Sequence, residues 1–389
     1  MNETTYISLD FYDEFQCIGN DCNSNCCAVG WNIPIDDETY QKYQDIRGRF
    51  GQFVRRNLYD KDGLHLIRMN EKNNCPFLNE DNLCNLYIQY GDDYMSETCT
   101  EFPRRFLNYD QIKLQSYSLS CEEVLRILYD KPDSVKLKEN GLLNETSEKE
   151  KSLLNLCKFL SWGMDFVQNP SIPFGKALSA LLYIGMNNTG FYCPDDTEMK
   201  SCLAQIPDTL NEFTIARQNI GAEELEQTAW QLIFVIADAF CLTVKECGAL
   251  NPEEFIWDDT FFSLSDEERK QKLYNCWKKR SKDSKHLTFM RRIAATLLFS
   301  DGMALSVQSP ESIFIQKIAN YIILAEVLPS AWNPEYQTSQ KQYATGLSLI
   351  CRIFDQSHVV DEFIYPTICD LVQPDVLTYA MVFMVLFDE

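Results

Sequence analysis

The sequence predicts a mostly α-helical protein in which a cysteine-rich metal-binding module precedes a multi-helix domain. Eight cysteines are crowded between residues 17 and 121, and helical apolar patterns dominate after residue 147. A polar, charged stretch at 131–150 separates the two regions. We therefore place a module of loops, short helices and room for a small hairpin at residues 1–135, and a helical domain at residues 136–389.

The crowded cysteines have spacings that allow several thiolates to meet at one point. Four of them fall in the segment C-I-G-N-D-C-N-S-N-C-C, and four more follow singly. Sulfur-only ligands suit zinc or an iron–sulfur cluster and disfavour magnesium or calcium. His65 is the only histidine in this region, so a metal site with both cysteine and histidine ligands could draw on only one histidine. The candidate metal ligands are Cys17, Cys22, Cys26, Cys27, Cys75, Cys84, Cys99 and Cys121.

Three other interpretations of these cysteines stay open. A disulfide framework is typical of small secreted chains, but the first fifteen residues show neither a basic n-region nor an apolar h-region, so we expect a reducing, cytoplasmic location. Buried free thiols pack like small hydrophobes, which suits one or two cysteines but not a cluster. A structural zinc site with four cysteine ligands is the strongest competitor.

Within the module, local signals indicate short elements. Residues 1–16 form an extended lead-in, and the segment from Cys17 to Cys27 has the composition of a loop. Because adjacent side chains diverge in a regular backbone, we expect Cys26 and Cys27 to point apart, one at a metal and the other into packing or a second site. Other expected elements are a helix from its N-cap Asp36 to about Leu58, a strand at 64–69 paired with 112–119, a short helix ending at Gly91, and a helix beginning at Cys121.

After the polar stretch, apolar residues recur at helical spacing, and S-D-E-E (265–268) and N-P-E-E (251–254) are typical capped starts. The remaining cysteines are spread out and are expected in the core: 157, 193, 202, 241, 247, 276, 351 and 369. The expected helices are 147–168, 173–187, 197–218, 222–246, 266–281, 286–301, 309–327, 336–355 and 374–387.

The charge balance limits the partners. The formal net charge is −22 and is spread over both regions, so nucleic-acid binding is not expected. An acidic surface instead attracts a lysine-bearing protein, although solubility alone explains it as well. The longest apolar runs, 230–241 and 376–387, are too short to span a bilayer, and the second would suit peripheral docking on a membrane or a partner.

The cysteine spacing also resembles a known pattern. C-x4-C-x3-C-C, C-P-F-L-x5-C and C-x2-F-P-R resemble the cysteine-rich zinc- or iron-chelating family. The flanking words G-W-N-I-P-I-D, G-x4-S-x2-C and S-C-E-E resemble the flagellin lysine-N-methylase family and cover residues 11 to 130. One departure is Glu122, which stands where that family's pattern S-C-P-E has proline.

The resemblance implies a protein lysine N-methyltransferase that uses S-adenosylmethionine, acts on flagellin and carries a [4Fe–4S] cluster, with zinc as the alternative. Cys22, Cys26, Cys75 and Cys99 are the foremost ligands. Trp31, Arg104 and Arg105 become candidate cofactor-binding residues. Either arginine would hold the methionine carboxylate of the donor, and an ordinary ion pair is the competing interpretation of the two arginines.

The catalytic residues and the donor site are not readable from the sequence. No G-x-G loop, P-loop or clustered C-x3-C-x2-C is present, so the donor would bind in a cleft between the two regions. Two other functions stay open: a non-catalytic module that binds zinc or iron, and a scaffold whose helical domain binds a partner. Binding of S-adenosylmethionine would distinguish the methyltransferase from both of these functions.

Overall fold

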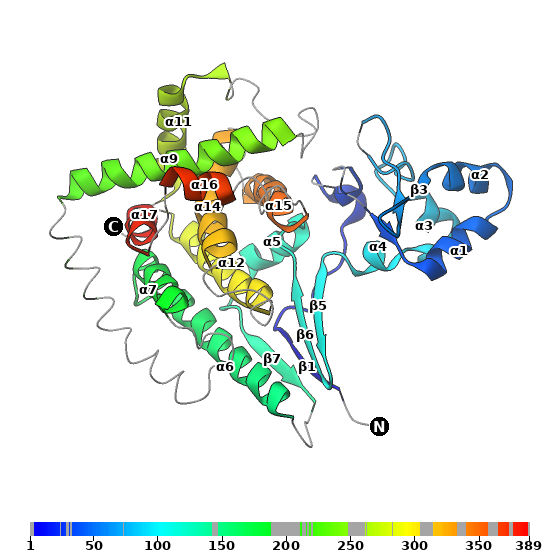
Figure 1. Cartoon of the computed structure of the whole chain (residues 1–389), viewed down its shortest axis with the longest axis horizontal. Helices are drawn as coiled ribbons and strands as arrows, with labels where there is room; N and C mark the ends of the chain where they lie inside the picture. The colour runs from blue at the N-terminus through cyan, green and yellow to red at the C-terminus, as the bar shows by residue number, and fades with distance from the viewer. Residues whose placement is uncertain are drawn as a thin grey trace.

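The computed structural model shows a mostly helical body with two small sheets near the N-terminus (Figure 1). Mostly helical architecture is therefore confirmed. The residues that the structure describes are 4–23, 25–28, 31, 33–72, 74–141, 147–187, 211, 215, 218, 221–247, 261, 263–281, 283–303, 314–332, 340–356, 365–372 and 376–387.

A small lobe follows the first cysteines and has its own core (blue at the right of Figure 1). Its apolar centre combines Tyr43, Val54 and Phe77 with aliphatic neighbours and Cys75. The strands β2 (Pro34–Ile35), β4 (Leu64–Ile67) and β3 (Leu58–Lys61) form an antiparallel sheet in that order. The other elements are η1 (Gly19–Asp21), η2 (Cys26–Ala28), α1 (Asp37–Asp45), α2 (Gly48–Arg56), α3 (Asn85–Tyr90), η3 (Asp92–Tyr94) and α4 (Glu97–Glu101).

The expected helix from Asp36 to about Leu58 is two helices. Asp36 caps α1 as expected, accepting a hydrogen bond from the Thr39 amide at 2.8 Å. The chain then turns at Ile46, which is extended, and at Gly48, whose φ of +79° favours glycine. Gly51 lets α2 close onto this turn, since a Cβ there would lie 1.9 Å from the Ile46 carbonyl oxygen. Two glycines therefore break what the apolar pattern predicts as one helix.

A four-stranded sheet joins this lobe to the helical body. Its order is β5 (Arg104–Tyr109), β6 (Ile112–Tyr117), β1 (Thr5–Leu9) and β7 (Leu137–Asn140), with β1 parallel to β6. The expected pairing of 64–69 with 112–119 is wrong, because β6 pairs with β5 across a turn at Asp110, where φ is +48°. A two-residue turn closes this hairpin locally, whereas the expected pairing needed a long crossing.

The helical body packs on this sheet and shares its core, which runs from Ile7 of β1 to Leu386 of the last helix. α12 lies against α6 and against β6, and α15 lies against α5, as Figure 1 shows. The elements are α5 (Glu122–Asp130), α6 (Glu148–Gln168), α7 (Phe174–Asn187), α9 (Ala222–Cys247), α11 (Asp266–Arg280), α12 (Ser284–Gly302), the π-helix η6 (Phe314–Ala319), α14 (Asn320–Trp332), α15 (Gln340–Gln356), α16 (Tyr365–Val372) and α17 (Val376–Phe387).

Two buried arginines of α12 bind the C-terminal ends of neighbouring helices. Arg291 donates to the carbonyls of Val167 in the last turn of α6 and of Asn169 directly after it, and Arg292 donates to Leu128 and Tyr129 at the end of α5. Carbonyls in the last turn of a helix have no partner inside the helix, so a cation there satisfies both their hydrogen bonding and the helix dipole. These contacts fix α5, which begins at Cys121, to the body.

The expected helices agree with the structure wherever residues are described, and α16 is an additional helix. Ser265 caps α11 as expected, and it does so in a capping box with Glu268. Cysteines 157, 241, 276 and 351 are buried as expected. Outside the described residues lie Cys193, Cys202, most of the expected helix 197–218 and the start at 251–254, as do the side chains of Cys247 and Cys369.

Two apolar helices bear on the membrane expectation. α17, proposed for peripheral docking, buries Tyr379, Val382 and Phe383 while packing on α7 and α9, so that apolar face is already covered. Within the described residues, Ala222–Leu242 of α9 is long and apolar enough to cross a bilayer by length and composition alone, but 50% of that window is buried inside the fold. This burial is typical of a core helix.

Candidate functional site

Seven of the eight candidate cysteines lie in one region, at the junction of the small lobe, the sheet and α15. Cys26 is its centre, because its charge acts on the thiols of Cys27, Cys75, Cys84, Cys99 and Cys121. Cys22 lies beside Cys121. Cys17 is exposed. We call the gathered residues the cysteine shell: Cys22, Cys26, Cys27, Cys75, Cys84, Cys99 and Cys121.

Backbone hydrogen bonds hold the first cysteines in place. η2 carries Cys26 and Cys27 in one tight turn, and the Cys75 amide donates to the Cys27 carbonyl at 2.7 Å. Trp31 braces the same turn, since its indole Nε1 donates to the Cys26 carbonyl at 2.7 Å and its ring packs on Phe102. The structure thus gives Trp31 a role in shaping the shell.

Three further cysteines sit at the starts of helices. Cys84 is the N-cap residue of α3, and Cys121 is the N-cap residue of α5. Cys99 lies in the first turn of α4, where its amide donates to the N-cap Ser96 hydroxyl at 3.3 Å. Each of these helix starts thus places a thiol in the shell.

The expectation that Cys26 and Cys27 point apart is wrong in one respect, because their thiols hydrogen-bond to each other. A tight 3-10 turn brings neighbouring side chains together where a strand would separate them. Cys27 also packs against the small apolar core, as one of the pair was expected to do. The twelve cysteines whose side chains the structure describes are free thiols.

The shell gives its thiols unequal acidity. The hydrogen bond from Cys27 is the largest cause of the lowered pKa of Cys26, about 7 against an ordinary 9.0, and the Arg352 guanidinium adds to the effect. Burial is the largest cause of the raised pKa of Cys75 and Cys121, both about 12, and of Cys99, about 11. Cys26 is therefore the thiol of this set that becomes anionic most readily.

The shell matches a soft metal in chemistry but not in arrangement. Its donors are sulfur atoms, which suit zinc or iron–sulfur clusters. Among the described residues, however, no group of three or more cysteine, histidine or acidic side chains is placed to hold a metal ion. The structure thus gathers the donors without closing a ligand set around one point.

A buried arginine from the distant α15 completes this region. Arg352 is only 3% exposed, donates through Nε to the Ser120 carbonyl at 3.0 Å, and lies near Cys22, Cys26 and Cys121. Glu122, the departure from the family pattern, is fully buried here and accepts a hydrogen bond from Asn23 at 3.3 Å. A buried guanidinium is stabilised by anionic neighbours, which the carboxylate and any thiolate supply.

A second polar group lies beside it, between β5, β6 and the helices. Arg105 pairs with the buried Asp301 of α12 at 3.0 Å. Ser118 donates to Asp355 of α15 at 2.5 Å. Burial raises the pKa of Asp355, the positive Arg105 opposes this, and the negative Asp301 reinforces it. We call Arg105, Ser118, Asp301 and Asp355 the seam.

The two candidate cofactor arginines therefore differ. Arg105 is committed to Asp301, as the ion-pair interpretation expected. Arg104 stacks over the Phe15 ring at 5.3 Å, and within the described residues it has no ion-pair partner. The guanidinium of Arg104 is therefore the one that could pair with an anionic ligand. Cofactor binding by either arginine or by Trp31 stays a prediction.

Sequence reasoning missed Arg352, Asp301 and Asp355. They lie on helices far along the chain, in patterns that read as ordinary helix faces. The one sequence signal for such residues is a charged residue at a position that the helical pattern predicts to be buried. Arg352 is such a case, standing in the apolar run L-I-C-R-I-F.

The chain resembles three curated proteins. It is 25% identical over 260 residues to the lysine-N-methylase of Salmonella typhimurium and, equally, to that of Salmonella choleraesuis, with 62% of this chain and 62% of each relative covered. It is 31% identical over 150 residues to the flagellar biosynthetic protein FliU of Salmonella muenchen, covering 36% of this chain and 85% of FliU. The chain thus spans less than two thirds of the two methylases.

No family model matches the chain. No solved structure matches it significantly.

The unequal acidity of the thiols predicts selective alkylation. In reduced, metal-free protein at pH 7.5, iodoacetamide should modify Cys26 before Cys75 and Cys121, because the thiolate is the reacting form. Peptide mass spectrometry across a pH series should give a Cys26 midpoint near 7. In a Cys27→Ala variant, which loses the thiol donor, the midpoint should rise. Equal rates at Cys26 and Cys75 would contradict this.

The adjacent arginines should separate in urea unfolding. Arg105→Met strands the Asp301 carboxylate, whose side chain is 2% exposed, and should cost about 3 kcal/mol. Arg104→Met removes a stacking contact and should cost below about 1 kcal/mol. The double variant Arg105→Met/Asp301→Leu should recover much of the loss. A similar cost for both single variants would show that the Asp301 pair does not anchor the seam.

Proposed function

The chain belongs to the flagellin lysine-N-methylase family, and on that premise we propose that it transfers methyl groups from S-adenosylmethionine to lysine side chains of a protein, with flagellin as the first candidate substrate. The observation that carries this proposal is the similarity to two lysine-N-methylases over 260 residues. The link to FliU, a protein named for flagellar biosynthesis, supports flagellin as the substrate. A cytoplasmic location is part of the same proposal.

The proposed reaction makes two demands on the protein. The lysine ammonium must lose a proton before its nitrogen attacks the methyl carbon, and the carbon–sulfur bond of the donor then breaks to leave S-adenosylhomocysteine. Desolvation and the positive sulfonium both lower the lysine pKa and so ease the first step. A carboxylate near the reacting amine is needed to receive the proton.

The seam offers groups suited to these demands. Asp355 has partial solvent exposure, and its raised pKa makes it a better proton acceptor than an exposed aspartate. We assign it the role of proton acceptor. Arg104, at the start of β5, is the arginine that would hold the methionine carboxylate of the donor.

The cysteine shell is proposed to hold a [4Fe–4S] cluster, with zinc as the alternative. Cys22, Cys26, Cys75 and Cys99 are the foremost ligands. The sulfur-only donors and the acidity of Cys26 support this assignment. Because the thiols do not close a ligand set in the structure, binding would have to draw them together, and no chemical step is assigned to the cluster.

The test combines donor, acceptor and cluster. Protein purified without oxygen and reconstituted with iron and sulfide is mixed with S-adenosylmethionine and flagellin from the same organism, and the flagellin is weighed by mass spectrometry. We expect mass gains in steps of one methyl group. Cys26→Ser should lose both iron and methyl transfer, because it removes the central thiol of the shell.

Cys157→Ser is the matched control, since this buried cysteine of α6 lies in the large core and not in the shell. It should keep both iron and activity. Methyl transfer by Cys26→Ser at the wild-type rate would show that the reaction does not require the cluster. No transfer by reconstituted wild-type protein to flagellin or to other lysine-rich proteins would favour a non-catalytic metal-binding module or a partner-binding scaffold.

A further inference from the structure

A groove separate from the cysteine shell runs between α9 and α11. Its cavity has a volume of about 540 Å³. α9 contributes Glu223, Glu226 and Trp230, and α11 contributes Glu267, Lys270 and Tyr274, with glutamines of both helices between them. On each helix these residues are three or four apart, so each set forms a single face. We call this cavity the α9–α11 groove.

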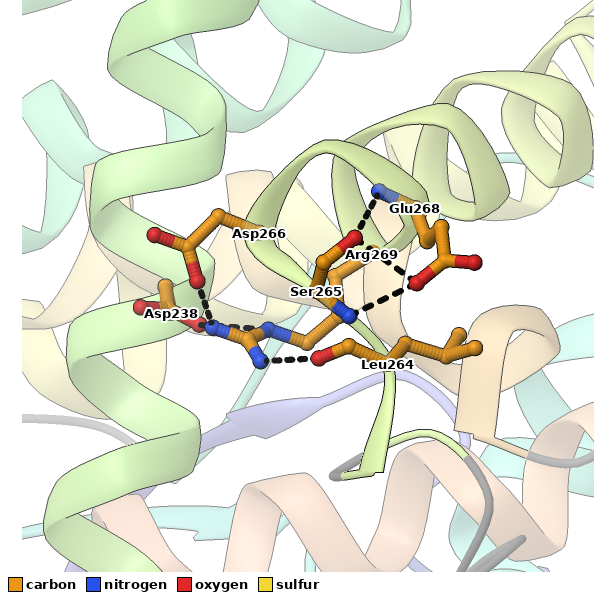
Figure 2. A network of polar contacts seen from close by, with 6 residues as sticks. All are labelled: Asp238, Leu264, Ser265, Asp266, Glu268 and Arg269. Carbon is orange, nitrogen blue, oxygen red and sulfur yellow. Dashed lines mark hydrogen bonds and ion pairs between the residues drawn. The ribbon is translucent and has the colours of Figure 1, made fainter.

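The groove has rigid walls. Arg269 of α11 donates to Asp238 of α9 at 2.9 Å, to Asp266 at 2.8 Å and to the Leu264 carbonyl at 2.8 Å. Figure 2 shows this guanidinium between the two carboxylates, beside the Ser265–Glu268 capping box that starts α11. At the other end of the groove, the Tyr274 hydroxyl donates to Glu226 at 2.9 Å. The two helices are therefore fixed to each other on both sides of the cavity.

Aromatic rings line one end. Trp230 and Tyr274 meet edge to face with centroids 5.1 Å apart, and Trp277 packs on both. Trp230 is 4% exposed, yet its indole Nε1 has no hydrogen-bond partner among the described residues. Buried indole N–H groups are normally paired, so this donor needs an acceptor that the described part of the chain does not supply.

The charge of the groove selects the ligand. Three carboxylates, of Glu223, Glu226 and Glu267, face a single ammonium, that of Lys270. Carboxylates beside aromatic rings attract cations through both charge and the electron-rich ring faces. Anionic and purely apolar ligands fit this lining poorly. A lysine side chain on an extended peptide provides an ammonium for the carboxylates and an apolar stem for the rings.

We propose that the α9–α11 groove docks a lysine-bearing segment of the protein substrate. This inference rests on the proposed function for the identity of the substrate, but the groove's preference for a cationic side chain follows from its lining alone. In Figure 1, α11 lies at the upper left of the helical body and α9 crosses its top, whereas the small lobe lies at the right. The groove therefore holds the substrate at a distance from the shell and the seam and does not take part in the chemistry.

The first experiment measures binding without the methyl donor. The probe is a fluorescein-labelled ten-residue peptide with three lysines among glycine, serine and asparagine, and its control carries glutamine in place of each lysine. Wild-type protein should bind the lysine peptide and not the control, more weakly as salt is raised. The variant E223Q/E226Q/E267Q should lose affinity by about tenfold or more.

The matched control variant is E71Q/E80Q/E224Q, which changes the net charge equally at three exposed glutamates that do not line the cavity. It should bind the lysine peptide like wild type. Equal losses in the two triple variants would overturn the proposal, because general surface charge would then explain binding. So would the absence of lysine-peptide binding by wild-type protein.

The second experiment separates this proposal from the proposed function. In the methyl-transfer assay, E223Q/E226Q/E267Q should raise KM for the protein substrate several-fold and leave kcat near wild type, since the groove only docks. An unchanged KM with active enzyme would overturn the groove and leave the activity intact. Groove-dependent peptide binding without any methyl transfer would support the groove while the proposed activity fails.

Discussion

The burial of Arg352 beside the cysteine shell is the constraint on which the junction of this protein depends. Removing a guanidinium from water costs several kcal/mol unless anionic groups and hydrogen-bond acceptors surround it. Here the Ser120 carbonyl, Glu122 and the thiols of Cys22, Cys26 and Cys121 do so. These groups come from the N-terminal loop, the connection between β6 and α5, and the start of α5, so one side chain of α15 joins three segments.

The same arrangement couples acidity to structure. Arg352 helps to lower the pKa of Cys26, and the charge of Cys26 in turn acts on five other cysteines. A soft metal ion or cluster binds thiolates, so the lowered pKa of Cys26 favours ligation, although the described thiols do not close a ligand set around one point. Asp355 of the neighbouring seam lies on the same helix, three residues after Arg352 and therefore within one turn of it. Donor site, proton acceptor and shell would thus share one junction, and the α9–α11 groove would be a separate docking surface.

Much of the fold was predictable because its signals are local. Asp36 and Ser265 cap helices by accepting hydrogen bonds from the amides three residues later in the chain. Cys121 begins a helix as its sequence indicates. The division of one expected helix at Gly48, and the pairing of β6 with β5 and β1, depend on backbone conformation and long-range packing that apolar spacing does not encode. Cys26 and Cys27 could be singled out as a pair, but not the turn that joins their thiols.

The site was predictable only in part. The cysteine spacing points to a shared region, and the structure gathers seven of the eight. Arg352 and Glu122 could not be paired from sequence, since they are 230 residues apart and meet only through tertiary packing. The groove was hidden for another reason: acidic and amide residues at helical spacing on α9 and α11 read as a solvent-exposed face.

Hydrogen exchange on the intact protein, wild type against Arg352→Met, tests most directly whether this arginine holds the junction. Methionine keeps the volume but leaves Glu122 and the Ser120 carbonyl without their cation. Amides from Cys22 to Cys27 and from Ser118 to Val124 should exchange about tenfold faster or more, while those of α9 and α11 keep their wild-type rates and report an intact body. Unchanged exchange around the shell in a folded variant would contradict the central role of Arg352.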